Sequence, residues 1–211
     1  MVDTGERRPP GRPPGGGRSP AESRQHILQV AKRCFAAKGV AATTMSDIAE
    51  AAGVNRVLIY RHFATRDIVV SGVLQQVAAE LLGFGMRRAE GMESLVDLVV
   101  HGVAELVDMI RSDPLITAVF TGDDRSDALR MATDDTAVHA QVHAFITQLL
   151  AQMPDQVRVE LRDDVPMEEL VTHLVHVGSG LVAAPDRIAG SRESLERYLR
   201  LFILPSFARP T

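Results

Sequence analysis

Apolar residues recur along this chain of 211 residues at the three- and four-residue intervals of amphipathic helices, and no segment shows the alternation typical of β-strands. The first helical stripe consists of Ile27, Val30, Ala31, Cys34 and Phe35. Ser19, Pro20 and Glu22 precede it as the N-cap, first-turn proline and acidic partner of a capping box. Gly39 follows it as a helix terminator. The pattern therefore predicts a first helix between Ser19 and Gly39.

Residues 43–63 contain two short helical patterns separated by a tight break. Thr44 is a suitable N-cap, and Asp47, three residues later, gives a near match to a capping box. Gly53 suits the left-handed residue that ends a helix, and Asn55 can cap the next one. A helix, a glycine-centred turn and a second helix form the arrangement of a DNA-reading helix-turn-helix.

The second of these helices carries hydrogen-bond donors outside its apolar face, which holds Ile59 and Phe63. The donors are Arg56, Tyr60, Arg61 and His62. Such groups reach phosphates and base edges, and no carboxylate lies within residues 55–65 to repel a phosphate backbone. The alternative is a small core hairpin with a solvated basic face, and spacing alone leaves both readings open.

Four segments of this stretch carry a wider likeness: residues 45–49 (MSDIA), 52–54 (AGV), 59–63 (IYRHF) and 66–67 (RD). Together they resemble the DNA-binding domain of the tetracycline-repressor (TetR) family, and the Tyr-x-His-Phe ending is their most specific part. The likeness runs from about Arg24 to about Val77.

The resemblance implies a set of DNA contacts at matching positions. Thr44 is expected to contact a phosphate at a helix N-terminus, and Tyr60, His62 and Arg66 are expected to make further backbone contacts. The candidates for phosphates or base edges are Ser46, Asn55, Arg56 and Arg61.

Val57 and Leu58 depart from the family pattern, which usually has small or polar residues at these two positions. If they face the groove, they can contact thymine methyl groups but cannot form hydrogen bonds. We therefore hypothesise a preference for thymine at the central positions of each half-site.

The formal net charge of −4 combines two unequal parts. Residues 1–66 carry 11 Lys+Arg and 5 Asp+Glu, whereas residues 67–211 carry 12 Lys+Arg and 22 Asp+Glu. A basic end beside an acidic remainder indicates that the N-terminal part meets a polyanion. Residues 1–18, rich in Arg, Pro and Gly, are expected to be a disordered arm, either a minor-groove contact or a solubilising tail.

The rest of the chain reads as helical, so the predicted fold class is all-α. Thr65 caps a long helix that the resemblance assigns to signal transmission, and further helical patterns cover residues 95–110, 114–120, 126–132, 135–153, 166–184 and 191–203. Residues 154–165 are the longest expected loop. The expected domains are residues 19–65, a three-helix DNA-binding domain, and residues 66–211, an effector-binding and dimerisation domain.

Residues 170–183 are apolar on more than one face and contain Gly178, where another backbone can approach closely. Either this is a central core helix, or its second face packs on a twin subunit. The resemblance implies that the last two helices form a four-helix bundle in a homodimer. The interface residues expected on this basis are Leu174, Val177, Gly178, Leu181, Leu199 and Phe202.

An effector pocket in the second domain would be mostly aliphatic, because this part of the chain supplies mainly Val, Leu, Ile and Met. It would suit a small apolar or amphipathic molecule, although the same residues could fill a closed core. The residues expected at the pocket are His101, Thr117, Phe120, His139, His143 and Phe145.

Other chemistry has weak support. His139 and His143 lie four residues apart and His173 and His176 three apart, but no cysteine cluster or His-Glu-x-x-His motif accompanies them, so we expect no metal and no cofactor. Glycine-rich phosphate loops and a Gly-x-Ser-x-Gly nucleophile elbow are absent, so no enzyme is indicated. Cys34, the one cysteine, reads as a small buried hydrophobe.

We saw no apolar run of membrane-spanning length and no secretion signal, so a cytoplasmic protein without a membrane partner is expected. The sequence thus predicts a ligand-responsive regulator that binds a palindromic operator in double-stranded DNA as a dimer. Of the two modes of regulation, we favour repression. The alternative is a helical small-molecule-binding protein or enzyme with an incidental basic N-terminus. Activation in place of repression also stays open.

Overall fold

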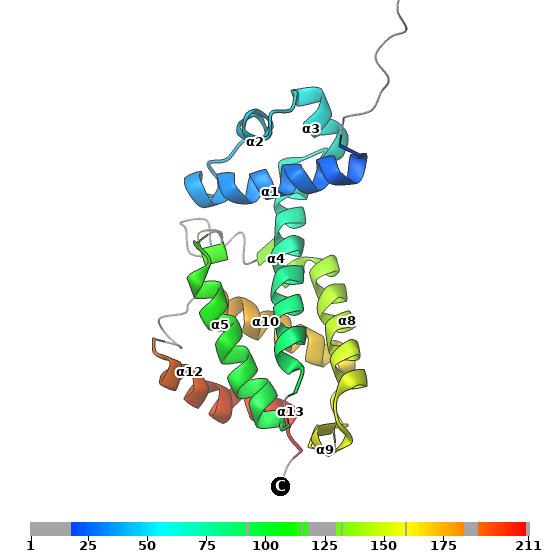
Figure 1. The fold of residues 1–211 in the computed structure, drawn as a ribbon, viewed down its shortest axis with the longest axis vertical. Coiled ribbons are helices and arrows are strands. Elements are labelled where there is room, and N and C mark those ends of the chain that lie inside the picture. The colour runs from blue at the N-terminus through cyan, green and yellow to red at the C-terminus, as the bar shows by residue number, and fades with distance from the viewer. Residues whose placement is uncertain are drawn as a thin grey trace, which may run out of the picture.

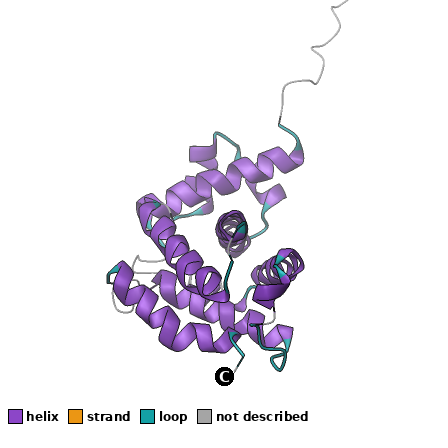
Figure 2. Ribbon diagram, turned by 60° about the horizontal axis from the view of Figure 1, so that its bottom comes forward, coloured by secondary structure: helices purple, strands orange, loops and turns teal. Residues whose placement is uncertain are grey.

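The computed structural model describes residues 18–91, 93–114, 116–117, 130–131, 133–158, 160–183 and 190–209. Within these ranges the chain is helical, and its one β feature is an isolated antiparallel bridge between Leu161 and Ala208. Figure 2 shows helices joined by loops throughout. The predicted all-α fold class is confirmed. Phe120 and most of the expected helix over residues 126–132 lie outside the described residues.

Capping residues set the ends of the N-terminal helices. The helices are α1 (Pro20–Lys38), α2 (Met45–Ala52) and α3 (Arg56–His62). Ser19 and Thr44 each form a complete capping box, and Asn55 caps α3 by accepting from the Leu58 amide. Gly53 ends α2 with a φ of 66°, in the left-handed region that glycine enters without strain. The predicted caps are therefore confirmed.

The long helix α4 (Arg66–Ala89) joins the two halves of the molecule. In Figure 1, α1 lies across one end of α4, while α5 and α8 flank its other end. The remaining elements are η1 (Asp97–Gly102), α5 (Val103–Ser112), α8 (Thr136–Gln152), α9 (Asp155–Arg158), α10 (Met167–Ala183), α12 (Arg192–Tyr198), η2 (Leu199–Ile203) and α13 (Leu204–Phe207). The short α9 lies inside residues 154–165, which the sequence pattern assigned to a loop.

By length and composition, α4 is apolar enough to cross a membrane, which corrects our statement that no such run exists. The reason lies in its packing. Its N-terminal half contributes Val69, Val70, Val73, Leu74 and Val77 to the core of the DNA-binding domain. Its C-terminal half lies against the helices of the second domain. A helix that serves two cores is apolar on several faces.

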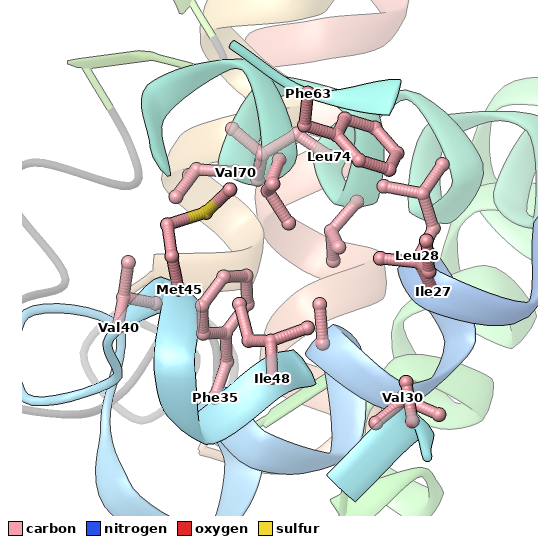
Figure 3. Packing of buried hydrophobic residues seen from close by; sticks show 14 of the residues in the cluster. Ile27, Leu28, Val30, Phe35, Val40, Met45, Ile48, Phe63, Val70 and Leu74 are labelled. Atoms are coloured by element: carbon pink, nitrogen blue, oxygen red, sulfur yellow. The ribbon is translucent and has the colours of Figure 1, made fainter. Parts of the chain in front are cut away.

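One hydrophobic cluster holds the N-terminal domain together. Side chains from α1, α2 and α4 converge in it, and Figure 3 shows Phe35, Ile48 and Val70 among them. The same cluster includes Ile110 and Ile116, which follow α4 in the chain. The hydrophobic core therefore continues across residue 65, where the sequence predicted a domain boundary.

Two wide π-helical turns, η1 and η2, interrupt otherwise continuous helices. In a π turn the hydrogen bond spans one residue more than in an α-helix, so residues after it rotate about the axis. Leu195, Leu199 and Ile203, spaced by four, are buried, whereas Phe202 is 63% exposed. Phe202 therefore lies on a different face from these three residues, although uniform α-helical spacing would place it beside Leu195 and Leu199.

Gly72 sets the closest approach between α1 and α4. A Cβ atom at this position would lie 2.8 Å from Cδ2 of Leu28, which is buried on α1. In contrast, a Cβ at Gly83, on the same helix, would meet only Nη1 of Arg87, at 3.5 Å. Alanine at Gly72 would therefore change both helix propensity and packing, whereas alanine at Gly83 would change helix propensity almost alone.

We expect Gly72→Ala to lower the free energy of unfolding by up to about 2 kcal/mol, because overpacking costs about 1–3 kcal/mol and the gain in helix propensity offsets about 1 kcal/mol of it. Gly83→Ala should raise stability by up to about 1 kcal/mol. Urea denaturation followed by circular dichroism measures both. Equal stabilisation by the two substitutions would show that Leu28 yields freely.

Candidate functional site

Helix α3 presents one face to solvent and buries the other. Ile59 and Phe63 have no exposed surface, and they fix the helix on the core. Val57 is 79% exposed and Tyr60 is 52% exposed. Asn55, Arg56 and Arg61 are also exposed, and Leu58 is half-buried. The exposed face therefore carries two guanidinium groups, a phenol and a valine, a set that can meet both phosphates and base edges.

Asn55 is partly committed to the fold. Its Oδ1 accepts from the Leu58 amide at 2.8 Å, which leaves its side-chain NH2 as the group able to donate to DNA. Arg56 follows at the first position of α3, next to the turn that Gly53 makes.

The N-terminus of α2 is organised by one carboxylate. Asp47 accepts from Nζ of Lys38 at 2.6 Å, and from the amide and hydroxyl of Thr44 at 2.8 and 2.7 Å. These bonds, that from Lys38 foremost, hold the pKa of Asp47 far below its ordinary range. Because the Thr44 hydroxyl already donates to Asp47, a phosphate at this helix end would have to replace that bond or bind beside it. Ser46, the next hydroxyl, is half-buried.

Arg66, a predicted phosphate contact, also has a role inside the domain. Its Nε donates to the carbonyl of Thr43 at 3.0 Å, and Nη2 donates to the carbonyl of Val40. These carbonyls belong to the loop between α1 and α2, where backbone acceptors need donors. Arg66 therefore ties this loop to the start of α4.

His62 is another predicted phosphate contact. It is half-buried, and its Nε2 is enclosed without a hydrogen-bond partner among the described residues. Its ring lies 6.4 Å from that of Phe63, centroid to centroid. Nε2 therefore points away from the exposed face of α3.

Sequence reasoning missed two positioning residues on α1. Arg24 donates from Nη1 to the His62 carbonyl at 3.0 Å, and its guanidinium lies 4.2 Å from the Phe63 ring centroid. His26 Nε2 lies 3.2 Å from the carbonyl of Ala52, at the end of α2. Both residues secure helix ends of the DNA-binding domain from a distant part of the chain, so no local pattern reveals them.

A buried lysine links the two domains. Lys32, on α1, is 4% exposed, and its Nζ lies 2.8 Å from Glu80 on α4 and 3.9 Å from Asp113 at the end of α5. A buried ammonium needs such partners, because desolvation without them costs several kcal/mol. Its position four residues after Leu28 and three before Phe35, within the apolar stripe, is a signal that could have identified it.

The second domain contains a cavity of about 440 Å³, within the range of small-molecule sites. Its wall is aliphatic and comes from α4, η1, α5, α8, α10, η2 and α13. The structure places Phe145 in this wall, opposite Gly85, where an added Cβ would lie 3.3 Å from the ring. Among the described residues, the polar side chains of the lining belong to Arg162, Ser179 and Ser206.

The polar tips expected from the sequence lie elsewhere. His101 sits 3.6 Å from Glu196 and 3.8 Å from Asp97, outside the lining. Thr117 donates to the Ile110 carbonyl at 3.0 Å. His139 Nε2 lies 2.8 Å from the Thr133 carbonyl, and His143 is exposed. Each of these polar groups is bonded to a neighbour or exposed, away from the apolar wall.

Most of the residues expected at a subunit interface also line the cavity. These are Leu174, Val177, Gly178, Leu181 and Leu199. Leu181 and Leu199 are buried within the subunit, so they cannot lie on its surface. The cavity thus accounts for part of the apolar surface of α10. Phe202 and its neighbour Leu201 are 63% and 56% exposed.

The remaining histidines and the cysteine have structural surroundings. His176 Nδ1 lies 2.7 Å from the Thr172 carbonyl, and the His173 ring lies 6.4 Å from that of Phe207. In the described part of the chain, no group of three or more His, Cys, Asp or Glu side chains is placed to hold a metal. Burial raises the pKa of the Cys34 thiol, which packs against the core.

Comparison with known proteins adds an independent line of support. Residues 27–71 match the family described as bacterial regulatory proteins, tetR family. The chain is 30% identical to the HTH-type transcriptional repressor AcnR of Corynebacterium efficiens over 209 residues, which cover 92% of this chain and 97% of the relative. It is 48% identical to the HTH-type transcriptional regulator AcrR of Shigella flexneri over 52 residues, 25% of this chain and 24% of the relative.

A solved structure shares the fold. The TetR family repressor AlkX from Dietzia sp. strain DQ12-45-1b superimposes with a TM-score of 0.60 at 19% sequence identity, covering 88% of this chain and 98% of that chain. At this identity the likeness concerns the fold alone.

The ionised Asp47 should stabilise the N-terminal domain in a pH-dependent way. Because its folded-state pKa is depressed, the contribution is present above the ordinary aspartate pKa of about 3.9 and is lost as pH falls further towards the depressed value. We expect Asp47→Asn to lower Tm by a constant amount from pH 7 to about pH 5, and by less at more acidic pH. Glu50→Gln, at an exposed carboxylate of the same helix, is the control. A Tm difference that does not shrink in acid contradicts this role.

The exposure of Val57 sharpens the thymine hypothesis, because Val57 faces solvent whereas Leu58 is half-buried. We expect Val57→Ser to weaken the preference for thymine at the central half-site positions, with a change of about 1–3 kcal/mol per base contact. Leu58→Ala should leave base preference unchanged. Selection of binding sites from a randomised duplex pool measures both, and an unaltered preference in Val57→Ser rules out the contact.

Proposed function

Because this chain belongs to the tetR family of bacterial regulatory proteins, and so is a DNA-binding transcriptional regulator, we propose that it represses transcription as a homodimer on a palindromic operator. A small apolar or amphipathic molecule entering the cavity would release it. The observation that carries the proposal is the exposed donor-rich face of α3 on a rigidly capped helix-turn-helix, joined by α4 to an apolar cavity.

On the DNA side, each subunit would place α3 in a major groove, with half-sites about 34–36 Å apart. Arg56 and Arg61 would supply direct contacts to the DNA, and Tyr60 a contact to the backbone. The basic balance of residues 1–66 supports this orientation, because the acidic remainder is repelled by phosphate. The naming of the Corynebacterium relative as a repressor supports repression over activation.

Dimerisation would use the C-terminal helices. Leu201 and Phe202 are large exposed apolar side chains on η2, and the Phe202 ring lies 5.4 Å from that of Tyr198. A second subunit would remove this patch from water. The interface we propose therefore centres on Leu201 and Phe202, with Gly178, exposed on α10, as a further candidate.

Signal transmission would run through α4. Leu74 and Val77 line the cavity and also belong to the hydrophobic cluster shared with α1. A molecule beside them changes the packing of both domains. It shifts the equilibrium only if it binds the two states unequally. We also propose that the protein acts in the cytoplasm, where chromosomal DNA is accessible.

The decisive experiment is binding of the purified protein to its own upstream intergenic DNA, titrated over salt, beside a scrambled duplex. We expect the intergenic duplex to bind more tightly and log K to fall linearly with log salt, because phosphate contacts release counterions. A small-molecule carrier or enzyme would use the cavity without this specificity. Equal, weak binding to both duplexes would contradict the operator assignment.

Single substitutions on α3 distinguish contacts to phosphates from contacts to bases. Arg61→Ala, if it contacts phosphate, should weaken binding to all sequences and reduce the magnitude of the salt slope by about 1.8, which is about 0.9 for each subunit of the dimer. Arg56→Ala, if it reads a base, should cost about 1–3 kcal/mol at one base position. Arg87→Ala removes the same charge from an exposed site on α4, so it serves as the control and should leave both quantities unchanged.

A further inference from the structure

We propose that the molecule held by the cavity is a neutral amphipath, with one long aliphatic tail and a single hydroxyl or carbonyl head, and that the head binds at Arg162 while the tail runs along α4. The inference rests on the effector site proposed above and specifies its chemistry. It comes from the uneven distribution of polar groups along the wall.

The wall of the cavity follows α4 for about three turns. Its wall includes α4 residues from Leu74 to Gly85, which span about 16 Å at 1.5 Å per residue. The Leu74 end adjoins the cluster shared with α1, and Val77 and Val138 line it there. This end is aliphatic, so it suits a hydrocarbon tail and offers a head group no partner.

The polar end is formed by the segment after α9 and by α13. Arg162 and Ser206 line the cavity there, and the Arg162 amide donates to the Phe207 carbonyl at 2.8 Å, which fixes the two segments together. In Figure 1, α9 and α13 lie at the opposite end of the molecule from α1. A molecule that used both ends would therefore have its head far from the DNA-binding domain and its tail pointing towards it.

The charge of Arg162 is already balanced by one neighbour. Arg162 donates from Nε and Nη2 to the two carboxylate oxygens of Asp164, at 2.8 and 2.7 Å. This pairing raises the pKa of Arg162 and lowers that of Asp164, so both stay charged. A guanidinium has five N–H groups and the pair uses two of them, so Arg162 can still donate to a ligand oxygen.

A neutral acceptor suits this arrangement better than a carboxylate. A carboxylate head would lose hydration and meet a pair with no net charge, within a domain that carries an excess of ten acidic groups over residues 67–211. A hydroxyl or carbonyl oxygen accepts from Arg162 without that cost. An alkane fills the same wall but forms no bond at the polar end.

The test compares decanol, methyl decanoate, decanoate and decane as probes for the full-length protein by isothermal titration calorimetry at neutral pH. We expect decanol and methyl decanoate to bind about tenfold more tightly than decane, the strength of one charge-assisted hydrogen bond, and decanoate to bind most weakly. Tighter binding of decanoate than of decanol overturns the proposal.

Two variants at the polar end identify the head site. Arg162→Met should abolish the difference between decanol and decane. Asp164→Asn should increase decanoate affinity relative to decanol, because the guanidinium charge is then unbalanced. Far-UV circular dichroism confirms that each variant is folded. If decanol still binds better than decane in folded Arg162→Met, the head lies elsewhere and the assignment fails.

A variant at the α4 end tests the tail. Ala78 lines the cavity, whereas Ala79 is exposed and outside the lining. Ala78→Leu should weaken dodecanol binding more than octanol binding, and Ala79→Leu should weaken neither. Equal effects of Ala78→Leu on both alcohols would contradict a tail along α4.

Failure of this proposal is distinguishable from failure of the proposed function. If no probe binds but the protein binds its operator specifically, the ligand class is wrong and the regulator assignment stands. If the probes bind in the expected order but operator affinity does not change with them, the cavity chemistry stands and release by ligand is wrong.

Discussion

The contact between α1 and α4 is the constraint on which the rest of the structure depends. At Gly72 the two helices approach so closely that a methyl group would collide with Leu28. Near it, the Lys32 ammonium is buried and must stay paired with Glu80 and Asp113. The two features together hold α1 in one register on α4.

The alignment of α1 on α4 matters for function because each of these helices supports a different site. α1 carries Arg24 and His26, which secure the ends of α3 and α2. α4 forms one wall of the cavity. A second polar link joins α4 to α8, where Asp135 caps α8 and accepts from Gln75 at 3.2 Å and from Ser71. Burial opposes ionisation of Asp135, but these hydrogen bonds outweigh it and keep its pKa below the ordinary value.

The features that the sequence predicts best are those that depend on residues close together in the chain. Ser19, Thr44, Asn55 and Thr65 were identifiable as caps because a cap and its amide lie two or three residues apart. Arg66 could not be assigned its internal role, since its acceptors lie 23 and 26 residues earlier and the packing of α1 decides where they are. The aliphatic character of the pocket was predictable from composition. Its polar end was not, because Arg162 reaches it only through the fold of the segment after α9.

The π turns η1 and η2 have a consequence for how such a domain can diversify. A π turn is equivalent to an α-helix that has taken in one additional residue. The turn takes up that residue locally, so losing it would return the segment to regular α-helix and leave the downstream faces nearly unchanged. In a helix that stays regular throughout, the same loss would rotate every later side chain by about 100° about the axis. The π turns are therefore places where the chain can gain or lose one codon while the side chains that face the chamber stay the same.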